Sequence, residues 1–325
     1  MKKHLSIAAL ALLAQVAAAP PVLAQASAAI ASGKAQPSPL APSEIVAAAP
    51  KGEWTAIPKT DLLVMELAPD AKGKPRRVVI QLMPPPFSQG WIGNIRKLAA
   101  AHWWDGMSVN RVQDNYVVQW GDPNADDKAK AKPLPAGMAM MAESEYSAPF
   151  RSQALAHTAG RSRGDEYSAA TLFNRGWPLA ADKRLARLWP IHCYGMVGVG
   201  RDLSPNTGSG AELYVVIGHA PRHLDRNIAL VGRVIEGMEY LSSLPRGHGA
   251  LGFVDPAQGD ERVPILSIHP GVEVADLPTY EYLSTESESF AKYADARANR
   301  KDAFFIKPAG GADVCNIPVP VRRVK

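Results

Sequence analysis

Residues 104–123 read WDGMSVNRVQDNYVVQWGDP, and two short apolar runs in this stretch are separated by a turn. The first run, residues 108–112, predicts a strand. The polar residues 113–115 predict a turn, and residues 116–120 predict a second strand. Residues 121–123, Gly-Asp-Pro, end that strand, because proline cannot donate a hydrogen bond to a sheet ladder.

Short apolar segments with similar spacing lie on both sides of this stretch. Gly73 predicts a hairpin turn between two of the strands. Apolar residues at helical spacing predict helices, with Ser88 as a possible cap of the first. Many short strands with only two clear helices are typical of an antiparallel β sandwich or barrel. The further strands are predicted at residues 61–67, 77–82, 194–199, 211–217, 228–231 and 263–268, and the helices at 87–102 and 233–244, with a shorter helical stretch at 181–188.

The composition is that of an ordinary globular protein. The chain has 325 residues, of which 46% are hydrophobic and 21% charged, so it can bury a core as one large domain or two small ones. The formal net charge is +5, with Lys and Arg spread along the chain. We therefore expect a mildly basic surface and no nucleic-acid partner. No internal repeat, nucleotide-binding glycine motif or metal-ligand spacing is present, so no cofactor and no metal site are expected.

The first 26 residues have the three parts of a secretory signal peptide. A basic start, Met1–His4, precedes an apolar run, and a small-residue cleavage site ends at Ala26. The competing interpretation is an uncleaved membrane anchor, but Gln15 and Pro20 interrupt the run before it reaches the ~20 apolar residues that a span needs. We expect a periplasmic protein with no integral membrane segment after cleavage.

The composition also divides the remainder of the chain. Residues 27–52 are rich in Ala, Pro and Ser and predict a flexible linker. A folded domain is predicted at 53–275, and a polar C-terminal extension at 276–325. Two cysteines are present, Cys193 and Cys315, and an oxidising compartment permits a disulfide between them. A plain buried thiol at Cys193 is equally compatible with the sequence.

Three ordered blocks resemble the cyclophilin family of peptidyl-prolyl cis/trans isomerases. In the first, residues 104–123, the spacing from Arg111 to Gln119 and Asp122 agrees with the family signature. The second and third blocks are residues 204–217 and 223–238. The resemblance covers roughly residues 60–270, apart from an insertion at about 124–190. It implies a mainly β fold, a closed antiparallel eight-stranded β-barrel with two capping helices.

The resemblance also implies the functional residues. Arg111 would be the catalytic residue that stabilises the twisted prolyl amide, and Gln119 would accept a hydrogen bond from it and hold it in place. A fixed guanidinium suits this chemistry because it keeps its charge and offers several donors. The implied substrate-binding residues are Tyr116, Val117, Gln119, Glu212, Tyr214, His223 and Leu224.

Several positions depart from the family pattern. Tyr116 and Tyr214 stand where the family has Phe, and His223 stands where Trp or Phe is common. Glu212 stands where the family has Gln. A carboxylate near Arg111 could orient the guanidinium, or it could occupy it and weaken its hold on a substrate.

These features predict a prolyl isomerase that assists the folding of exported proteins. Its partners would be proline-containing polypeptides, and we expect a monomer. Two alternatives remain open. One is a cyclophilin-like module that binds proline-containing peptides with little or no turnover. The other is an envelope scaffold whose C-terminal tail docks a partner.

Overall fold

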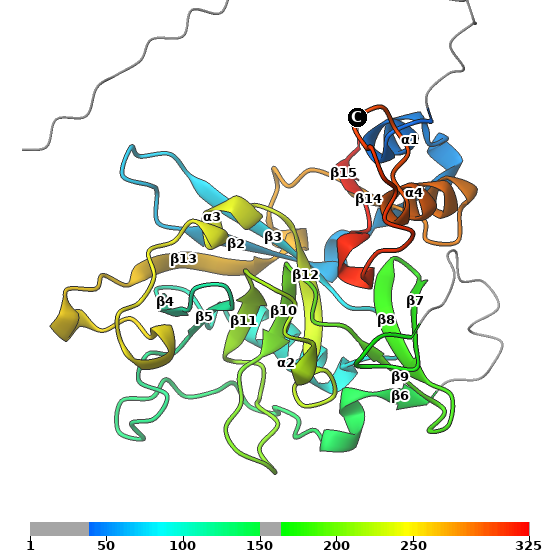
Figure 1. The fold of residues 1–325 in the computed structure, drawn as a ribbon. Coiled ribbons are helices and arrows are strands. Elements are labelled where there is room, and N and C mark those ends of the chain that lie inside the picture. The colour runs from blue at the N-terminus through cyan, green and yellow to red at the C-terminus, as the bar shows by residue number, and fades with distance from the viewer. Residues whose placement is uncertain (1–38, 150–163, 325) are drawn as a thin grey trace, which may run out of the picture. The chain divides into compact units, whose positions relative to one another are not determined.

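A computed structural model of the protein describes residues 39–149 and 164–324 (Figure 1). The predicted signal peptide, residues 1–26, and residues 27–38 of the predicted linker lie outside these residues. The helices are α1 (Pro42–Ala48), α2 (Gln89–Ala100), α3 (Met238–Ser242) and α4 (Glu288–Ala298). The strands are β1 (Trp54–Ile57), β2 (Leu62–Leu67), β3 (Arg76–Leu82), β4 (Ser108–Val112), β5 (Val117–Gly121), β6 (Ala148–Pro149), β7 (Ala170–Asn174), β8 (Trp177–Asp182), β9 (Arg187–Pro190), β10 (Met196–Val199), β11 (Leu213–Val216), β12 (Leu230–Glu236), β13 (Val263–Pro270), β14 (Tyr280–Leu283) and β15 (Val321–Arg323).

Eight strands close into a barrel in the order β10-β11-β5-β4-β13-β2-β3-β12, and neighbouring strands are antiparallel. The predicted fold class is confirmed. The predicted hairpin of β2 and β3 is also present. It turns at Gly73, whose φ of 77° is costly for residues with a side chain, and whose N–H donates to the Asp70 carbonyl at 2.8 Å.

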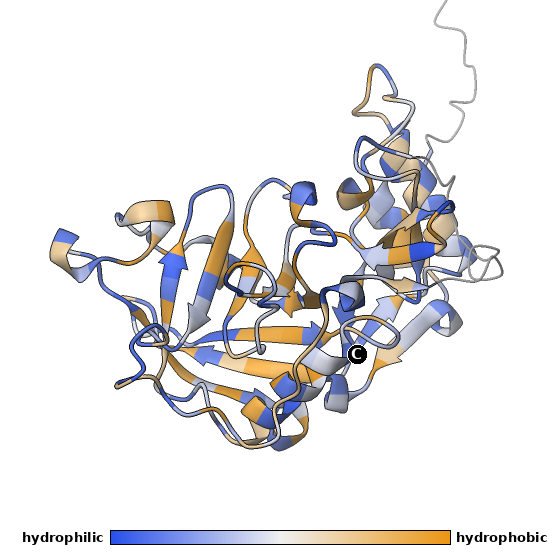
Figure 2. Ribbon diagram, turned by 90° about the horizontal axis from the view of Figure 1, so that it is seen from below, coloured by the Kyte–Doolittle hydropathy of each residue, from blue (hydrophilic) through white to orange (hydrophobic). Residues whose placement is uncertain are grey.

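The barrel interior is filled by side chains. Val118 and Trp120 on β5 are fully buried in the main hydrophobic core, and Gln119 between them faces the other way, as the two-residue period of a strand requires. Figure 2 shows the hydrophobic residues gathered on the barrel strands, whereas many loops are hydrophilic. Since a barrel of this size has no room for a ligand inside, a functional site must lie on its outer surface.

Helix α2 confirms the first predicted helix. Trp91, Ile95 and Leu98 recur at helical spacing and are fully buried. The Nε1–H of Trp91 donates to the Thr207 carbonyl at 3.0 Å. Ser88 takes the N-cap position as predicted, but its φ is 55° and its side chain makes no capping hydrogen bond.

The prediction of a helix over residues 233–244 is wrong in its first part. Residues up to Glu236 continue β12, because they pair with β3 on one side and β10 on the other. Gly237 then takes a φ of 83°, and the helix α3 spans only Met238–Ser242. The local pattern fits a helix, but two neighbouring strand edges supply hydrogen-bond partners that a helix would leave unpaired.

The predicted insertion forms a second sheet, in the order β6-β9-β8-β7. The helical stretch predicted at 181–188 is wrong, because residues 177–182 and 187–190 are the paired strands β8 and β9. Ala180 and Ala181 on β8 and Trp189 on β9 are fully buried. Burial against the main core therefore overrides a weak local helical pattern.

The segments beyond the barrel form a third sheet, β1-β14-β15. The predicted linker needs a correction, since residues 42–48 form α1, which packs against α4 of the C-terminal extension. Burial of Pro42 and Ala49 fixes this segment. A disulfide joins Cys193, before β10, to Cys315 of the extension. Among the described residues, no helix has both the length and the apolar character to cross a membrane.

Candidate functional site

Arg111 lies on β4 beside a β-bulge. The pairing of β4 with β5 shifts between Val109 and Arg111, and Arg111 then stands opposite Gln119. The extra residue, Asn110, is buried, and its Nδ2 donates to the Gly121 carbonyl at 3.0 Å. Bulges re-aim side chains next to functional sites. This bulge brings the Arg111 and Gln119 side chains together on the outer face.

Three hydrogen bonds fix the Arg111 guanidinium. Its Nε donates to the Leu251 carbonyl at 2.7 Å, Nη1 donates to Oε1 of Gln119 at 3.1 Å, and Nη2 donates to Oε1 of Gln113. A guanidinium has five N–H donors, so two remain for a substrate. Burial lowers the pKa of Arg111 below its usual value, against the opposing charge of Glu212, but an arginine still keeps its proton at neutral pH.

Gln119 connects Arg111 to Glu212. While Oε1 of its amide accepts from Arg111, Nε2 donates to the Glu212 carboxylate at 2.8 Å. Among the described residues, the ion pairs include none between Arg111 and Glu212. Glu212 therefore orients the Gln119 amide, and that amide presents its oxygen to Arg111. This relay through Gln119 favours the role in which Glu212 orients the Arg111 guanidinium over the role in which it occupies the guanidinium. The charge of Glu212 also acts on Arg111 from a distance.

Glu212 is half-buried against two glycines. A β-carbon on Gly121 would come within 3.2 Å of its side chain, and one on Gly200 within 2.9 Å. Burial raises the pKa of Glu212. The hydrogen bond from Gln119 and the charge of Arg111 oppose this shift only in part.

Three of the predicted substrate-binding residues form an apolar cluster beside Arg111. Val117 and Tyr214 are 3% and 4% exposed, and the half-buried Tyr116 packs against them. The Tyr116 ring centre lies 5.6 Å from the guanidinium carbon of Arg111. Val216 and Ile228 complete the cluster. The buried members form a floor, and Tyr116 and Ile228 form its accessible rim.

Tyr214 is held from below by His192, a residue for which the sequence predicted no functional role. The Tyr214 hydroxyl and Nε2 of His192 are 2.8 Å apart, and Nδ1 of His192 lies 2.8 Å from Oδ1 of Asp225. Burial lowers the pKa of His192, against the influence of Asp225, and burial raises the pKa of Tyr214. His192 is thus neutral, its Nδ1–H donates to Asp225, and its Nε2 accepts from the tyrosine hydroxyl.

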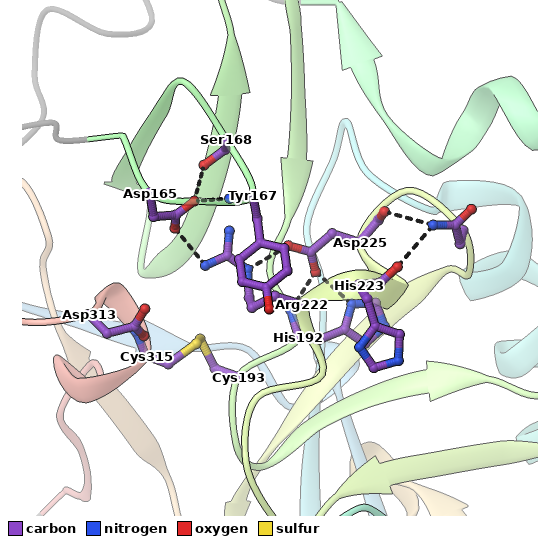
Figure 3. A network of polar contacts seen from close by, with 11 residues as sticks. Asp165, Tyr167, Ser168, His192, Cys193, Arg222, His223, Asp225, Asp313 and Cys315 are labelled. Carbon is purple, nitrogen blue, oxygen red and sulfur yellow. Dashed lines mark hydrogen bonds and ion pairs between the residues drawn. A yellow bond between two sulfur atoms is a disulfide. The ribbon is translucent and has the colours of Figure 1, made fainter.

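Figure 3 shows how this network continues to the insertion. Oδ2 of Asp225 accepts from Nε of Arg222 at 2.7 Å, and Nη1 of Arg222 donates to Asp165 at 2.7 Å. The Tyr167 ring centre lies 5.1 Å from the Arg222 guanidinium carbon. Arg222 is 3% exposed. A buried arginine between two carboxylates therefore ties Asp165, at the start of the second described part of the insertion, to the barrel.

The remaining two predicted residues, His223 and Leu224, lie on the 3-10 turn Arg222–Leu224. His223 is exposed and Leu224 is half-buried, and Leu224 is not part of the apolar cluster of the described residues. Nδ2 of Asn227 donates to the His223 carbonyl at 3.0 Å, which fixes the turn. These two residues therefore lie on an anchored turn next to Asp225, separate from the cluster.

The loop before β13 also contributes to the site, and no sequence motif predicted this. Phe253 pairs with Arg111 as an isolated bridge, and its ring centre lies 5.4 Å from the guanidinium carbon. The side chain is 41% exposed. Phe253 and Tyr116 thus place two aromatic rings near one cation.

A separate hollow of about 240 Å³ lies away from Arg111 and contains none of the predicted site residues. It lies between the barrel and the C-terminal extension, beside the disulfide of Cys193 and Cys315. Arg233, which borders it, is 8% exposed and stacks on Trp177 at 4.5 Å, and its Nη2 is buried without a hydrogen bond. That nitrogen is closed to solvent, so it cannot contact a ligand in the hollow.

The comparisons with known proteins show which family and which fold this chain resembles. The sequence profile of the family described as cyclophilin type peptidyl-prolyl cis-trans isomerase/CLD matches residues 86–268. This range includes all three predicted blocks and all of the residues predicted for the site. No curated protein has a significantly similar sequence.

Solved structures share the fold. A cyclophilin from Hirschia baltica superposes with a TM-score of 0.61 at 20% identity, covering 84% of this chain and 94% of its own. A cyclophilin-type peptidyl-prolyl cis-trans isomerase from Cryptosporidium parvum, solved in the presence of the dipeptide Ala-Pro, has a TM-score of 0.38 at 11% identity, covering 64% of this chain and 98% of its own. The likeness to the first establishes the fold.

Proposed function

This chain belongs to the cyclophilin-type peptidyl-prolyl cis-trans isomerase family and is an enzyme of that class, and we propose that Arg111 is its catalytic residue and that exported polypeptides are its substrates. The observation that carries the first part is the fixed guanidinium of Arg111. Three hydrogen bonds hold it beside an apolar cluster, and two donors remain free.

The reaction needs a group that favours a twisted amide. Resonance in the bond before proline sets a barrier of roughly 18–20 kcal/mol to rotation. When the bond twists, the prolyl nitrogen loses conjugation and becomes a better hydrogen-bond acceptor. A donor that is already in position stabilises this state without reorganising. Arg111 supplies such a donor, and Gln119 limits its movement.

The apolar cluster suits the proline ring. Tyr116 and Ile228 offer the accessible surface, above a floor of Val117 and Tyr214. A proline ring against this rim would place the prolyl nitrogen, which belongs to the amide before proline, near Arg111, because the Tyr116 ring centre lies 5.6 Å from the guanidinium carbon. The site needs neither a metal nor a cofactor for this step.

The disulfide supports the proposal that the protein works outside the cytoplasm. Cys193 and Cys315 are joined, and such bonds persist in oxidising compartments. Together with the secretory signal pattern of residues 1–26, this favours the periplasm and clients that fold there.

Substitution of Arg111 tests the proposal. In a protease-free assay on a tetrapeptide with one internal proline, Arg111→Ala should lower kcat/KM by about 10²–10³-fold, the usual cost of one preorganised donor. Arg111→Lys should also be impaired, since lysine keeps the charge but lacks the planar set of donors. Arg96→Ala on α2 is the control, because Arg96 pairs with Asp61 outside the site. Equal activity of Arg111→Ala and the wild type would refute the role of Arg111.

A binding module with little turnover remains the second candidate. The observation in its favour is that Arg111 already donates three hydrogen bonds within the protein, including two to glutamines. Under this alternative the wild type binds the same peptide but accelerates its isomerisation only slightly, and Arg111→Ala weakens binding without changing this slow rate. Isothermal titration beside the kinetic assay separates the two.

A further inference from the structure

A second cluster of side chains lies outside the site, at the end of α2. His102 and Asp105 follow that helix, and His269 lies near the end of β13. One ligand atom from each of the three lies within 4.8 Å of those of the other two. Nε2 of His269 is 2.9 Å from Oδ2 of Asp105, and Nδ1 of His102 is 3.8 Å from the same oxygen. The two imidazole rings stack with centres 3.9 Å apart.

We propose that His102, Asp105 and His269 form a binding site for a divalent transition-metal cation, with zinc as the representative ion. Two imidazole nitrogens and one carboxylate oxygen are a ligand set that zinc uses in proteins, with further positions left for water. Two imidazoles argue against calcium and magnesium, which take oxygen ligands.

The spacing suits such an ion. Ligand atoms about 2.1 Å from a tetrahedral zinc ion lie ~3.4 Å apart. The separations of 2.9 and 3.8 Å lie on either side of this value, and all three ligand atoms lie within 4.8 Å of one another, so a bound ion requires shifts of less than about 1.5 Å. The His102 side chain is 47% exposed and that of His269 is 27% exposed, so an ion can reach both rings from solvent.

A fourth residue fixes the tautomer of His102. Nε2 of His102 lies 2.9 Å from Oε2 of Glu273, and a carboxylate can only accept, so Nε2 carries the proton. In the neutral ring, Nδ1 then presents a lone pair toward the carboxylate oxygen of Asp105. These two acceptors make a place for a cation. Nε2 of His269 donates to the same Asp105 oxygen, so it would release its proton to solvent when it binds the ion. Metal-binding histidines commonly donate their second ring N–H to a carboxylate in this way.

Asp105 is itself held in place, since its Oδ1 accepts from the backbone N–H of Ile268 at 3.3 Å. The site therefore joins the turn after α2 to the end of β13, two segments more than 160 residues apart in the sequence. A bound ion would act as a cross-link between them and stabilise the folded state in proportion to its concentration.

The test uses the protein purified without a polyhistidine tag and stripped with EDTA, then titrated with zinc chloride by calorimetry. Both cysteines are in the disulfide, so no thiol competes for the metal. The wild type should bind zinc, and His102→Gln and His269→Gln should each weaken binding at least about tenfold. Glu273→Gln should weaken it about tenfold with the stoichiometry kept, as expected for an orienting carboxylate.

The matched control is His248→Gln. His248 also pairs with a carboxylate, that of Asp260, but it belongs to no cluster of three ligands among the described residues. This variant should bind zinc like the wild type. The proposal is overturned if the wild type does not bind zinc, if the double variant His102→Gln/His269→Gln binds as tightly as the wild type, or if His248→Gln loses as much as His269→Gln.

Thermal unfolding gives a second readout. Zinc should raise the midpoint of the wild type but not that of the double variant, and an equal rise with calcium would overturn the assignment to transition metals. Melting in EDTA shows whether each variant folds, and His102→Gln, with its exposed ring, is the variant least dependent on packing. Because Arg111→Ala should keep its zinc affinity, this test is independent of the isomerase assay.

Discussion

Gln119 donates a 2.8 Å hydrogen bond to the Glu212 carboxylate with one end of its amide and accepts from Arg111 with the other. Since an amide is both donor and acceptor, it can satisfy a carboxylate and a guanidinium at once. The orientation of Arg111 thus depends on a residue that it does not contact. Four predictions follow from this relay and from the structures around it.

Gln119→Glu should break the relay. The new carboxylate would lie next to that of Glu212, and it would pair with Arg111 more strongly than an amide does. We expect kcat/KM to fall at least about tenfold at neutral pH. Two adjacent carboxylates raise the pKa of one of them, so part of the activity should return as the pH is lowered.

Gln113→Glu is the matched control for that effect. Gln113 also accepts from Arg111, so this variant gives the guanidinium a carboxylate. Glu212 accepts its hydrogen bond from Gln119, so a carboxylate at position 113 has no direct hydrogen-bond link to Glu212. Activity should fall without the recovery at lower pH. Identical pH profiles for the two variants would contradict the relay.

Glu212→Gln should change how stability depends on pH. Burial raises the pKa of Glu212 in the folded state, so the favourable contribution of its protonated form is complete below the unfolded pKa and is lost as the pH rises through the folded one. Glutamine does not ionise, so the variant does not lose this stability as the pH rises. In urea unfolding it should therefore be more stable than the wild type at pH 7, and this advantage should shrink below about pH 4.

Glu288→Gln tests a carboxyl group whose contribution to stability depends on pH in the opposite direction. The hydrogen bond from Lys292 lowers the pKa of Glu288, so its contribution is present above the unfolded pKa and is lost in acid. This variant should show no gain at pH 7. A gain of equal size in both variants would show that the effect is not specific to burial of Glu212.

Tyr214→Phe should destabilise the fold, although phenylalanine is common at this position in the cyclophilin family. Loss of the hydroxyl leaves the buried Nε2 of His192 without its donor, which costs about 1–3 kcal/mol. Urea unfolding measures the loss. Tyr116→Phe on the half-buried rim should stay within about 0.5 kcal/mol of the wild type. A neutral Tyr214→Phe would show that water replaces the hydroxyl.

Removal of the disulfide should lower stability. The bond joins Cys193 and Cys315 across a separation of 122 residues, and bridges that close long loops contribute about 2–5 kcal/mol. The double variant Cys193→Ser/Cys315→Ser avoids a lone thiol. Dithiothreitol should lower the wild type to the level of this variant and should leave the variant unchanged. An effect of the reductant on the variant would indicate another cause.

The strand pattern around Arg111 was predictable because alternation along a strand is local. The two-residue period predicts the paired strands β4 and β5. It also predicts that Trp120 is buried while its neighbour Gln119 faces the other side of the sheet. The predictions at 233–244 and 181–188 were wrong because pairing partners distant in sequence decided between helix and strand. Local propensity is a weak preference, and tertiary contacts override it.

The grouping of side chains could be predicted only in part. The resemblance implied Arg111, Gln119 and the tyrosines as one site, and their contacts agree with this. It did not predict the roles of His192 and Phe253, because no sequence pattern marks a hydrogen bond beneath a ring or a loop that folds over a strand.

By itself, the sequence determined the cyclophilin-type barrel and the position of Arg111 within it. Both are encoded in short segments, where periodicity and motif spacing act over a few residues. Only the tertiary structure decided that Gln119 stands between Arg111 and Glu212, and that His102 and His269 meet. Gln119 and Glu212 are 93 positions apart in the sequence, and His102 and His269 are 167 positions apart. Only closure of the barrel and packing of its helix bring these residues together. Arg111 and its partner Gln119 were therefore visible in the sequence, whereas the position of Glu212 behind Gln119 was not.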